Sequence, residues 1–250
     1  MHTTIHTPPQ SFIDRDTPPP IDGQFATLAK KIHQYWQDGG SDVLPLSRGD
    51  NQLVSASVAT KSEQACLNTP KPDACVLVAI TDEAVPRILL TQRAATLNSH
   101  AGEVSFVGGK VDETDASSRA AALREAHEEV GLMEVHTTLI GYLPMQMSRA
   151  GLLVRPVVMA IDAAAMGQLV ANEDEIGAIF WLPFADILSP PIDHQMMRQV
   201  GDQRYILRTP AWLGCDGVGE QVVWGLTARI LANLAEIGFG KHYPWYYRLA

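Results

Sequence analysis

Apolar residues near the start of the chain recur at helical spacing. Phe25, Leu28, Ile32 and Trp36 lie three or four positions apart, which aligns them on one side of an α-helix. The pair Gly39-Gly40 follows directly and is typical of a helix end. The pattern therefore predicts a short amphipathic helix that packs on the main body of the protein.

The regions on either side of this helix have little to bury. Residues 1–22 carry five prolines among polar side chains, so we expect a disordered or loosely draped arm there. The helix and a polar lead-in then occupy residues 23–71. Together these two segments form an extension in front of the main domain.

Short apolar runs predict strands from position 75 onward. Residues 75–80 form a continuous apolar run, and residues 87–91, after a turn-prone segment, predict its hairpin partner. A third strand is expected over 104–107, closed by Gly108-Gly109. Similar runs predict further strands over 137–143, 152–161 and 176–182.

Two helices are expected among these strands. The first covers 120–130, with Ser117 or Ser118 as its N-cap and Gly131 at its C-cap. The second covers 222–237. Strand pairs combined with two helices predict an α/β protein with a mixed sheet flanked by helices.

Composition narrows the classes of partner. The net charge of −9 over 250 residues argues against a nucleic-acid surface, which normally carries a basic patch. No apolar run approaches the roughly 18 residues that a membrane span requires. Residues 1–10 lack the apolar core of a signal peptide, and the three cysteines form no CxxC pair. We therefore expect a cytoplasmic protein that binds a small molecule and no nucleic acid or membrane.

Three glutamates share one face of the helix at 120–130. At about 100° per residue, Glu128 and Glu129 lie roughly 60° and 40° to either side of Glu125. Carboxylates this close repel one another, and Arg124 offsets only part of that repulsion. Hard oxygen ligands on one face suit Mg²⁺ or Mn²⁺. From the helix alone, a solvated acidic face is an equally good interpretation.

The segment before the helix changes that balance. Gly108-Gly109 allows the backbone to approach a ligand closely, and Asp115 follows in the connecting loop. The chain reads Gly109, five residues, Asp115, eight residues, then Arg124-Glu125-Ala126-His127-Glu128-Glu129-Val130-Gly131-Leu132. This pattern resembles the signature of the Nudix hydrolases. Asp115 stands where the signature has glutamate, and one extra residue precedes Arg124.

The departures are typical of one branch of that family, the coenzyme A diphosphatases. The branch also carries an upstream segment, and here the match runs through Leu89-Leu90-Thr91-Gln92-Arg93-Ala94, Gly102 and Phe106. Asn98 and Val107 replace the arginine and proline of the branch pattern. The resemblance covers about residues 72–240, which we take as the domain, leaving an aromatic tail at 241–250.

The resemblance implies an α/β/α sandwich of the Nudix type and a metal-dependent diphosphatase. The reaction expected is coenzyme A plus water giving 3′,5′-ADP and 4′-phosphopantetheine. Mg²⁺ or Mn²⁺ would be held by Glu125, Glu128, Glu129 and the carbonyl of Gly109. Arg124 joins the three glutamates in the catalytic set by orienting their carboxylates. The residues expected to bind substrate are Arg93, Gly108, Gly109 and Lys110.

Several assignments stay open at this point. The general base is one of Glu125, Glu103 or the acidic residues at 173–175. His127 is expected at the surface, whereas His100 is a weaker candidate for ligand contact. The aromatic residues at 245–247 are expected to pack on the domain or on a second subunit, so a homodimer remains a candidate assembly.

Two rival functions are also consistent with the sequence. Asn98 and Val107 favour a Nudix hydrolase of another nucleoside diphosphate derivative, such as ADP-ribose, a dinucleotide or a nucleotide sugar. A non-catalytic ligand sensor on the same fold is the second rival. The intact set of three glutamates and the acidic charge argue against the sensor.

Overall fold

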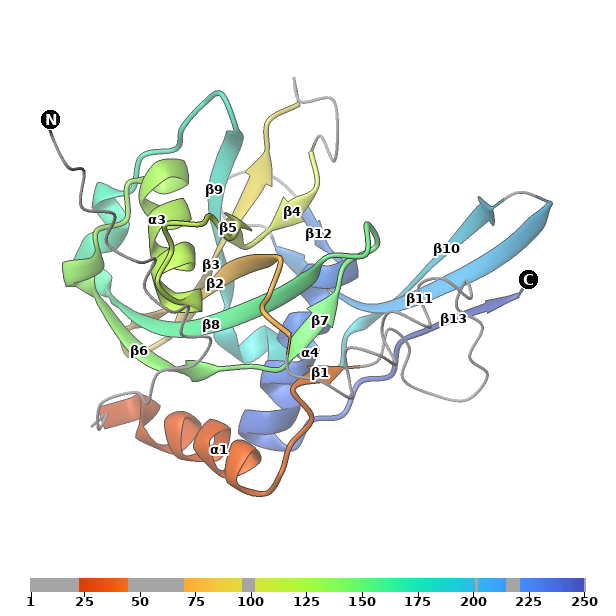
Figure 1. Ribbon diagram of the computed structural model, residues 1–250, viewed down its shortest axis with the longest axis horizontal. Coiled ribbons are helices and arrows are strands. Elements are labelled where there is room, and N and C mark those ends of the chain that lie inside the picture. The colour runs from red at the N-terminus through yellow and green to blue at the C-terminus, as the bar shows by residue number, and fades with distance from the viewer. Residues whose placement is uncertain (1–22, 45–69, 96–101, 201, 215–220, 250) are drawn as a thin grey trace, which may run out of the picture.

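The protein is built around a central sheet with helices on both faces (Figure 1). The structure, a computed structural model, describes residues 23–44, 70–95, 102–200, 202–214 and 221–249. The arm at 1–22, and with it Asn98 and His100, therefore lie outside the described residues. Among the residues described, no helix is long and apolar enough to cross a membrane.

The central sheet is mixed. Strand β2 (Ala74–Asp82) runs parallel to β8 (Leu153–Asp162) and antiparallel to β3 (Arg87–Arg93) on its other side. The main path through the sheet is β1-β7-β8-β2-β3-β4. The short strands on this path are β1 (Val43–Leu44), β7 (Met145–Met147) and β4 (Val104–Ser105). Three more strands join it: β5 (Val107–Lys110), β6 (Thr137–Tyr142) and β9 (Ile176–Pro183).

Alternation along β2 explains why both faces of the sheet are covered. Cys75, Leu77 and Ala79 belong to a buried cluster with the apolar side of α3 (Ser118–Val130). Val78 and Ile80 belong to the opposite cluster, which includes side chains of α1 (Ala26–Gln37) and α4 (Gly225–Phe239). Because successive residues of a strand face opposite ways, one continuous apolar run builds both cores. Figure 1 shows the resulting three layers.

The predicted N-terminal helix is confirmed as α1, preceded by a short 3-10 turn, η1 (Gly23–Phe25). Leu28 and Ile32 are buried in the cluster shared with α4. The Trp36 indole N–H donates a hydrogen bond to the carbonyl of Tyr142, 3.0 Å away. The helix is thus fastened to the end of β6 as well as to α4.

A second, smaller sheet was not predicted from the sequence. It contains a long hairpin, β10 (Ile192–Val200) with β11 (Gln203–Gly214), which extends away from the central sheet in Figure 1. Strands β12 (Gln221–Val223) and β13 (Tyr246–Leu249) pair with β11. The predicted C-terminal tail therefore contains a strand, and Trp245 directly before it is buried in the core.

The boundary predicted for the last helix was wrong at its start. Val222 lies in β12, and the helix begins only at Gly225, whose φ is 69°. The β-branched pair Val222-Val223 extends the small sheet instead of starting a helical turn. Trp224, in extended conformation, is the N-cap residue between the two elements.

The glycine pair was also misplaced. Gly108 and Gly109 do not close a strand but lie inside β5, which pairs with β2. Gly108 has a φ of 150°, and a β-carbon there would collide with the backbone of Cys75 and Val76. Only glycine allows the two strands to approach this closely.

The connecting turns complete the chain. The 3-10 segments η2 (Glu134–His136), η3 (Ala163–Gln168) and η4 (Phe184–Leu188) follow α3, β8 and β9 respectively. In the turn before β8, the Ser148 hydroxyl accepts a hydrogen bond from the N–H of Leu152 at 3.0 Å.

Candidate active site

Both predicted caps of α3 are confirmed. The Ser117 hydroxyl accepts a hydrogen bond from the N–H of Ala120 at 3.0 Å, and Gly131 takes the left-handed conformation with φ 70°. The helix therefore begins and ends where its sequence requires. Its apolar residues pack on the sheet, so the three glutamates project from the remaining surface beside β5.

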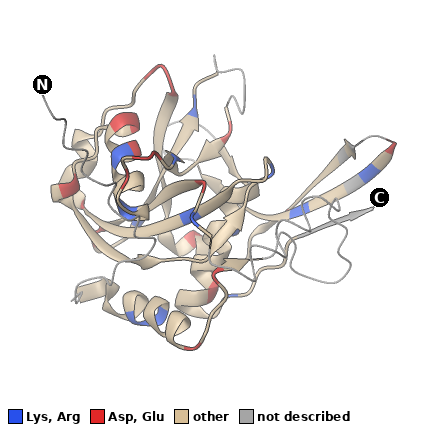
Figure 2. Cartoon of the chain, in the orientation of Figure 1, with Lys and Arg blue, Asp and Glu red and all other residues tan. Residues whose placement is uncertain are grey.

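Arg124 holds the carboxylates on this side of the helix together. Its guanidinium donates hydrogen bonds to both oxygens of Asp115, at 3.2 and 3.1 Å, and to Glu125 and Glu128 at 3.0 and 3.1 Å. A further bond reaches the carbonyl of Lys110 at 3.0 Å. The pKa of Arg124 is raised above its ordinary value, first by the hydrogen bonds that it donates to Asp115. Figure 2 shows acidic and basic positions meeting on α3.

Asp115 therefore acts through Arg124 in this structure. Its side chain is buried, and one of its oxygens also accepts the N–H of Asp112 at 2.8 Å. The Asp115 carboxylate thus bonds to the loop before α3 through Asp112 and holds the Arg124 guanidinium in place. The shorter side chain that departs from the signature thus has a local structural role.

Glu125 lies directly against the glycine strand. A β-carbon at position 109 would collide with the Glu125 carboxylate, so this carboxylate packs over the bare backbone of Gly109. The Glu125 side chain is 16% exposed. Burial raises the pKa of Glu125 against the lowering effect of Arg124, and the charges of Glu128 and Glu175 raise it further.

Glu129 is the most deeply buried of the three glutamates. It is 5% exposed, and its carboxylate accepts a hydrogen bond from the N–H of Gly108 at 3.2 Å. Burial raises the pKa of Glu129 to about 7, and the nearby charges of Glu125 and Glu175 act in the same direction. The Gly108 N–H and the charge of Arg93 act in the opposite direction. A buried carboxylate of this kind is poised between its two protonation states near neutral pH.

These couplings link residues that are far apart in the sequence. Glu175, just before β9, lies close enough to raise the pKa of both Glu125 and Glu129, although its own side chain is exposed. Arg93, at the end of β3, lies on the same side. Of the open candidates for the general base, Glu125 and Glu175 are thus close to Glu129, whereas Glu103 lines the neighbouring cavity beside α4.

The donor set fits a hard divalent cation. The carboxylates of Glu125 and Glu129 lie against the backbones of Gly109 and Gly108, Glu128 lies beside them on α3, and burial penalises the charge on Glu125 and Glu129. A bound cation would remove that penalty, because oxygen ligands suit Mg²⁺ and Mn²⁺. In the described part of the chain, no three ligand side chains are already gathered as a metal cluster. Glu125 and Glu128 instead accept hydrogen bonds from Arg124, and with Glu129 they are the side chains that would hold the cation.

Comparison with known proteins assigns the family. The model of the NUDIX domain matches residues 71–202, about half of the chain. The chain belongs to the Nudix family. Two relatives carry the name Nudix hydrolase NudL and are described as uncharacterized. The protein from Cronobacter sakazakii is 42% identical over 163 residues, covering 65% of this chain and 80% of the relative. The one from Escherichia coli is 41% identical over 163 residues with the same coverage.

Solved Nudix structures show weaker similarity. An Ap4A hydrolase from C. elegans, as a binary complex, is 19% identical with a TM-score of 0.39, covering 46% of this chain and 83% of its own. A NUDIX hydrolase from Alicyclobacillus acidocaldarius is 19% identical with a TM-score of 0.38, covering 48% and 82%. Neither similarity bears on the substrate of this chain.

Family membership confirms the coarse predictions. The chain has the Nudix-type α/β fold and is a hydrolase of a class that acts on diphosphate bonds. Members of the family generally use divalent metal ions. The substrate, the metal and the roles of individual residues are finer questions.

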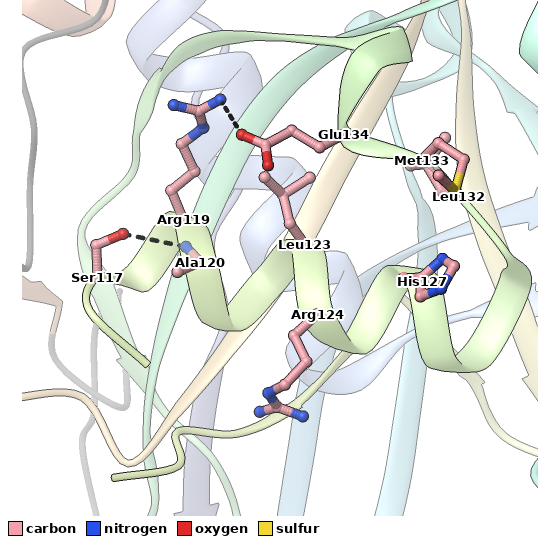
Figure 3. Close-up of a pocket in the computed structure, with 9 residues that line it drawn as sticks. All are labelled: Ser117, Arg119, Ala120, Leu123, Arg124, His127, Leu132, Met133 and Glu134. Atoms are coloured by element: carbon pink, nitrogen blue, oxygen red, sulfur yellow. Dashed lines mark hydrogen bonds and ion pairs between the residues drawn. The ribbon is translucent and has the colours of Figure 1, made fainter. Parts of the chain in front are cut away.

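Two cavities lie near the Nudix helix. The larger, about 380 Å³, is on the outer side of α3, where Arg119, Leu123 and His127 face Met133 and Glu134 (Figure 3). An ion pair between Arg119 and Glu134, 2.7 Å long, crosses it. The second, about 310 Å³, lies between the ends of β3 and β4, the turn before β8 and the start of α4. Only the second contains Arg93, which is coupled to Glu129.

The basic side chains around the site lie in different surroundings. Arg155 is fully buried and donates to the carbonyl of Leu143 and to Asp42, so it is a structural residue. Lys110 is exposed, and its carbonyl accepts from Arg124. Arg93 and Arg149 line one cavity. His127 is exposed, as predicted.

The sequence did not predict that β11 forms part of the wall of the cavity that contains Arg93 and Arg149. Leu207 is buried and faces the cavity, but its strand was not predicted. The run Tyr205-Ile206-Leu207 is a strand signal, and Pro210 shortly after it obscured the pattern.

Proposed function

We propose that this chain hydrolyses the diphosphate linkage of coenzyme A or its derivatives, with Mg²⁺ or Mn²⁺ as cofactor. Water attacks phosphorus, the bridging P–O bond breaks, and the products are 3′,5′-ADP and 4′-phosphopantetheine. Glu125, Glu128, Glu129 and the carbonyl of Gly109 would hold the cation. When bound, the cation neutralises phosphate charge and lowers the pKa of a coordinated water.

The chain's own groups prepare this chemistry. The Gly108 N–H keeps the Glu129 carboxylate in place, and the bare Gly109 leaves room for Glu125. Arg124 is a positioning residue, because its hydrogen bonds reach Asp115, Glu125 and Glu128. For the general base we favour Glu175 or Glu125, whose charges already influence each other beside Glu129.

A single observation supports the coenzyme A branch. The upstream segment that resembles it forms β3 and ends at Arg93, next to the Nudix glutamates. The Arg93 guanidinium makes no hydrogen bond or ion pair with another residue in the described ranges. A cation without a partner beside the carboxylates is suited to a ligand phosphate. With Gly108, Gly109 and Lys110, Arg93 forms the proposed substrate-binding set.

The second candidate is another nucleoside diphosphate derivative. It is favoured by Asn98, which lies outside the described residues, and by Val107, which is fully buried where the branch pattern has proline. The fold and the metal chemistry would be the same. The two candidates differ only in what surrounds the diphosphate.

The deciding experiment is product identification by mass spectrometry. Coenzyme A, ADP-ribose and NADH would each be incubated with the full chain and Mg²⁺, Mn²⁺ or chelator. We expect metal-dependent release of 4′-phosphopantetheine, chiefly from coenzyme A. Cleavage of only ADP-ribose or NADH would assign the protein to a different Nudix branch. No hydrolysis of any of the three substrates would favour a ligand sensor.

Three further predictions about the whole protein are also proposals. The residue limits of the domain, 72–240, the cytoplasmic location and a homodimer rest on the sequence. Trp245 does not serve as a free docking group, since it is buried within the chain's own core.

A further inference from the structure

The cavity of about 310 Å³ beside α4 adjoins the proposed active site. Arg93 forms part of its wall, and in the ladder between β3 and β9 it pairs with Ile176, the residue after Glu175. Ser105 also lines the cavity, three residues before Gly108, whose N–H donates to the Glu129 carboxylate. The opposite wall is formed by Arg149, in the turn before β8, and by the first turn of α4. A substrate whose diphosphate lies at the glutamates would therefore extend directly into this cavity.

The charged side chains that line the cavity are mainly basic, with Arg93 and Arg149 beside the single carboxylate of Glu103. Like Arg93, Arg149 has no hydrogen bond or ion pair with another residue in the part of the chain that the structure describes. Two guanidinium groups without partners thus line a single cavity of a chain with net charge −9. Guanidinium groups are suited to phosphate oxygens, which they can bind through paired hydrogen bonds.

The rest of the wall is apolar and includes an aromatic ring. Leu207, Trp224 and Leu226 line the cavity, and the Trp224 indole packs against the ring of His194 with centroids 5.5 Å apart. That contact limits the rotation of the indole. An indole held in this way offers a surface on which a nucleobase can stack.

The walls are tied to one another by hydrogen bonds. The Thr227 hydroxyl donates to the carbonyl of Val104 at 3.0 Å, which fixes the first turn of α4 to β4. The Gln92 amide donates to Gln221 at 3.0 Å, which links β3 to β12. The cavity is therefore formed before any ligand arrives, which reduces the entropic cost of binding.

We propose that this cavity binds the nucleotide end of the substrate, and that Arg149 recognises a phosphate on the ribose outside the diphosphate. The inference rests on the proposed function. Arg93 then faces the diphosphate, Trp224 contacts the base, and Arg149 pairs with the additional phosphate. The volume lies at the lower limit of the about 300–1,000 Å³ usual for small-molecule sites, so it suits one end of coenzyme A.

The test compares coenzyme A with 3′-dephospho-coenzyme A, which has the same diphosphate and lacks only the ribose phosphate. For wild type we expect a higher kcat/KM on coenzyme A. In Arg149→Ala the ratio of the two kcat/KM values should fall roughly tenfold, in line with loss of a charged hydrogen bond at an exposed site. Arg119→Ala, on the outer side of α3, is the matched control and should keep the wild-type ratio.

A binding measurement separates this inference from the proposed function. Calorimetry with adenosine 3′,5′-bisphosphate and with AMP needs no turnover. We expect wild type to prefer the bisphosphate by about tenfold and Arg149→Ala to lose the preference. An unchanged preference in the variant, or none in wild type, would overturn the nucleotide assignment even if coenzyme A is hydrolysed. If coenzyme A is not hydrolysed, the proposed function fails and the binding result still decides the cavity.

Discussion

The two sides of α3 carry similar residues in different surroundings. On the side facing β5, Glu125 and Glu129 are largely buried against glycine backbone, and burial raises the pKa of both. On the outer side, Arg119 and Glu134 form an ion pair whose carboxylate is 66% exposed. The outer side has the larger cavity, but there Arg119 is already paired with Glu134. The capacity for catalysis is therefore indicated by buried carboxylates with raised pKa values and not by the volume of a cavity.

The helix itself explains how the two sides differ. Glu128 and Glu129 are neighbours in the sequence, but the Glu128 side chain is 56% exposed whereas Glu129 is buried. A rotation of about 100° per residue turns one toward solvent and the other toward Gly108. Residues farther round the helix, such as Arg119 and His127, line the outer cavity, so we expect substitutions there and at Glu129 to have very different effects.

Glu129→Gln should have the largest effect on catalysis. The amide keeps the shape of the side chain but removes the charge of a proposed metal ligand. We expect turnover of the best substrate to fall at least ~10²-fold, as for other single catalytic groups. Glu134→Gln makes the same chemical change on the outer side and should leave turnover near wild type. A Glu129→Gln rate close to wild type, in a folded protein, would remove Glu129 from the metal site.

The same variant should also change stability as a function of pH. Because the pKa of Glu129 is raised to about 7 from 4.5, the folded protein binds more protons than the unfolded chain between these values. Stability of the metal-free protein is therefore lost as the pH rises through this window. Glu129→Gln should remove the loss, raising the free energy of unfolding by up to roughly 3 kcal/mol at pH 8.

This effect would be measured by denaturant unfolding in chelator at pH 4.5 and 8. The difference between variant and wild type should be mostly absent at pH 4.5, where Glu129 is protonated in the folded protein and half protonated in the unfolded chain. Equal differences at the two pH values would show that the burial of Glu129 is not what penalises its charge. Saturating Mg²⁺ should narrow the difference at pH 8, since it stabilises the charged carboxylate.

Gly109→Ala should reduce activity with little loss of stability. The new β-carbon would meet only the far end of the flexible Glu125 side chain, which can move aside at the expense of its position. We expect about a tenfold loss of turnover. Gly167→Ala, where nothing lies within 4 Å, is the control. A Gly109→Ala enzyme with normal turnover would show that Glu125 does not need its position over Gly109.

The neighbouring glycine sharpens that comparison. A β-carbon at Gly108 would meet the backbone of Cys75 and Val76, which cannot move aside, and the φ of 150° is unfavourable for alanine. Gly108→Ala should therefore lower the free energy of unfolding by at least ~1 kcal/mol. Thermal or denaturant unfolding of the two variants side by side would check the distinction.

Features that depend on residues close together in the sequence could be predicted, whereas features that depend on the pairing of distant segments could not. The caps of α3, the helix at Phe25 and the strand at 75–80 follow from spacing and side-chain type, and all are present. The coupling of Glu175 and Arg93 to Glu129 could not be predicted, because it depends on strand pairing between distant segments. The β10–β11 hairpin was missed because its strands carry mixed polar residues and a proline.

His127→Ala should have the smallest effect. The imidazole is exposed, lines the outer cavity and lies on the side of α3 away from Gly108 and Gly109. Alanine favours the helix, so folding should be retained and kcat/KM should change by less than about twofold. Steady-state rates on the best substrate would check this. A tenfold loss would mean that substrate reaches the outer cavity, and the distinction between the two sides of α3 would no longer hold.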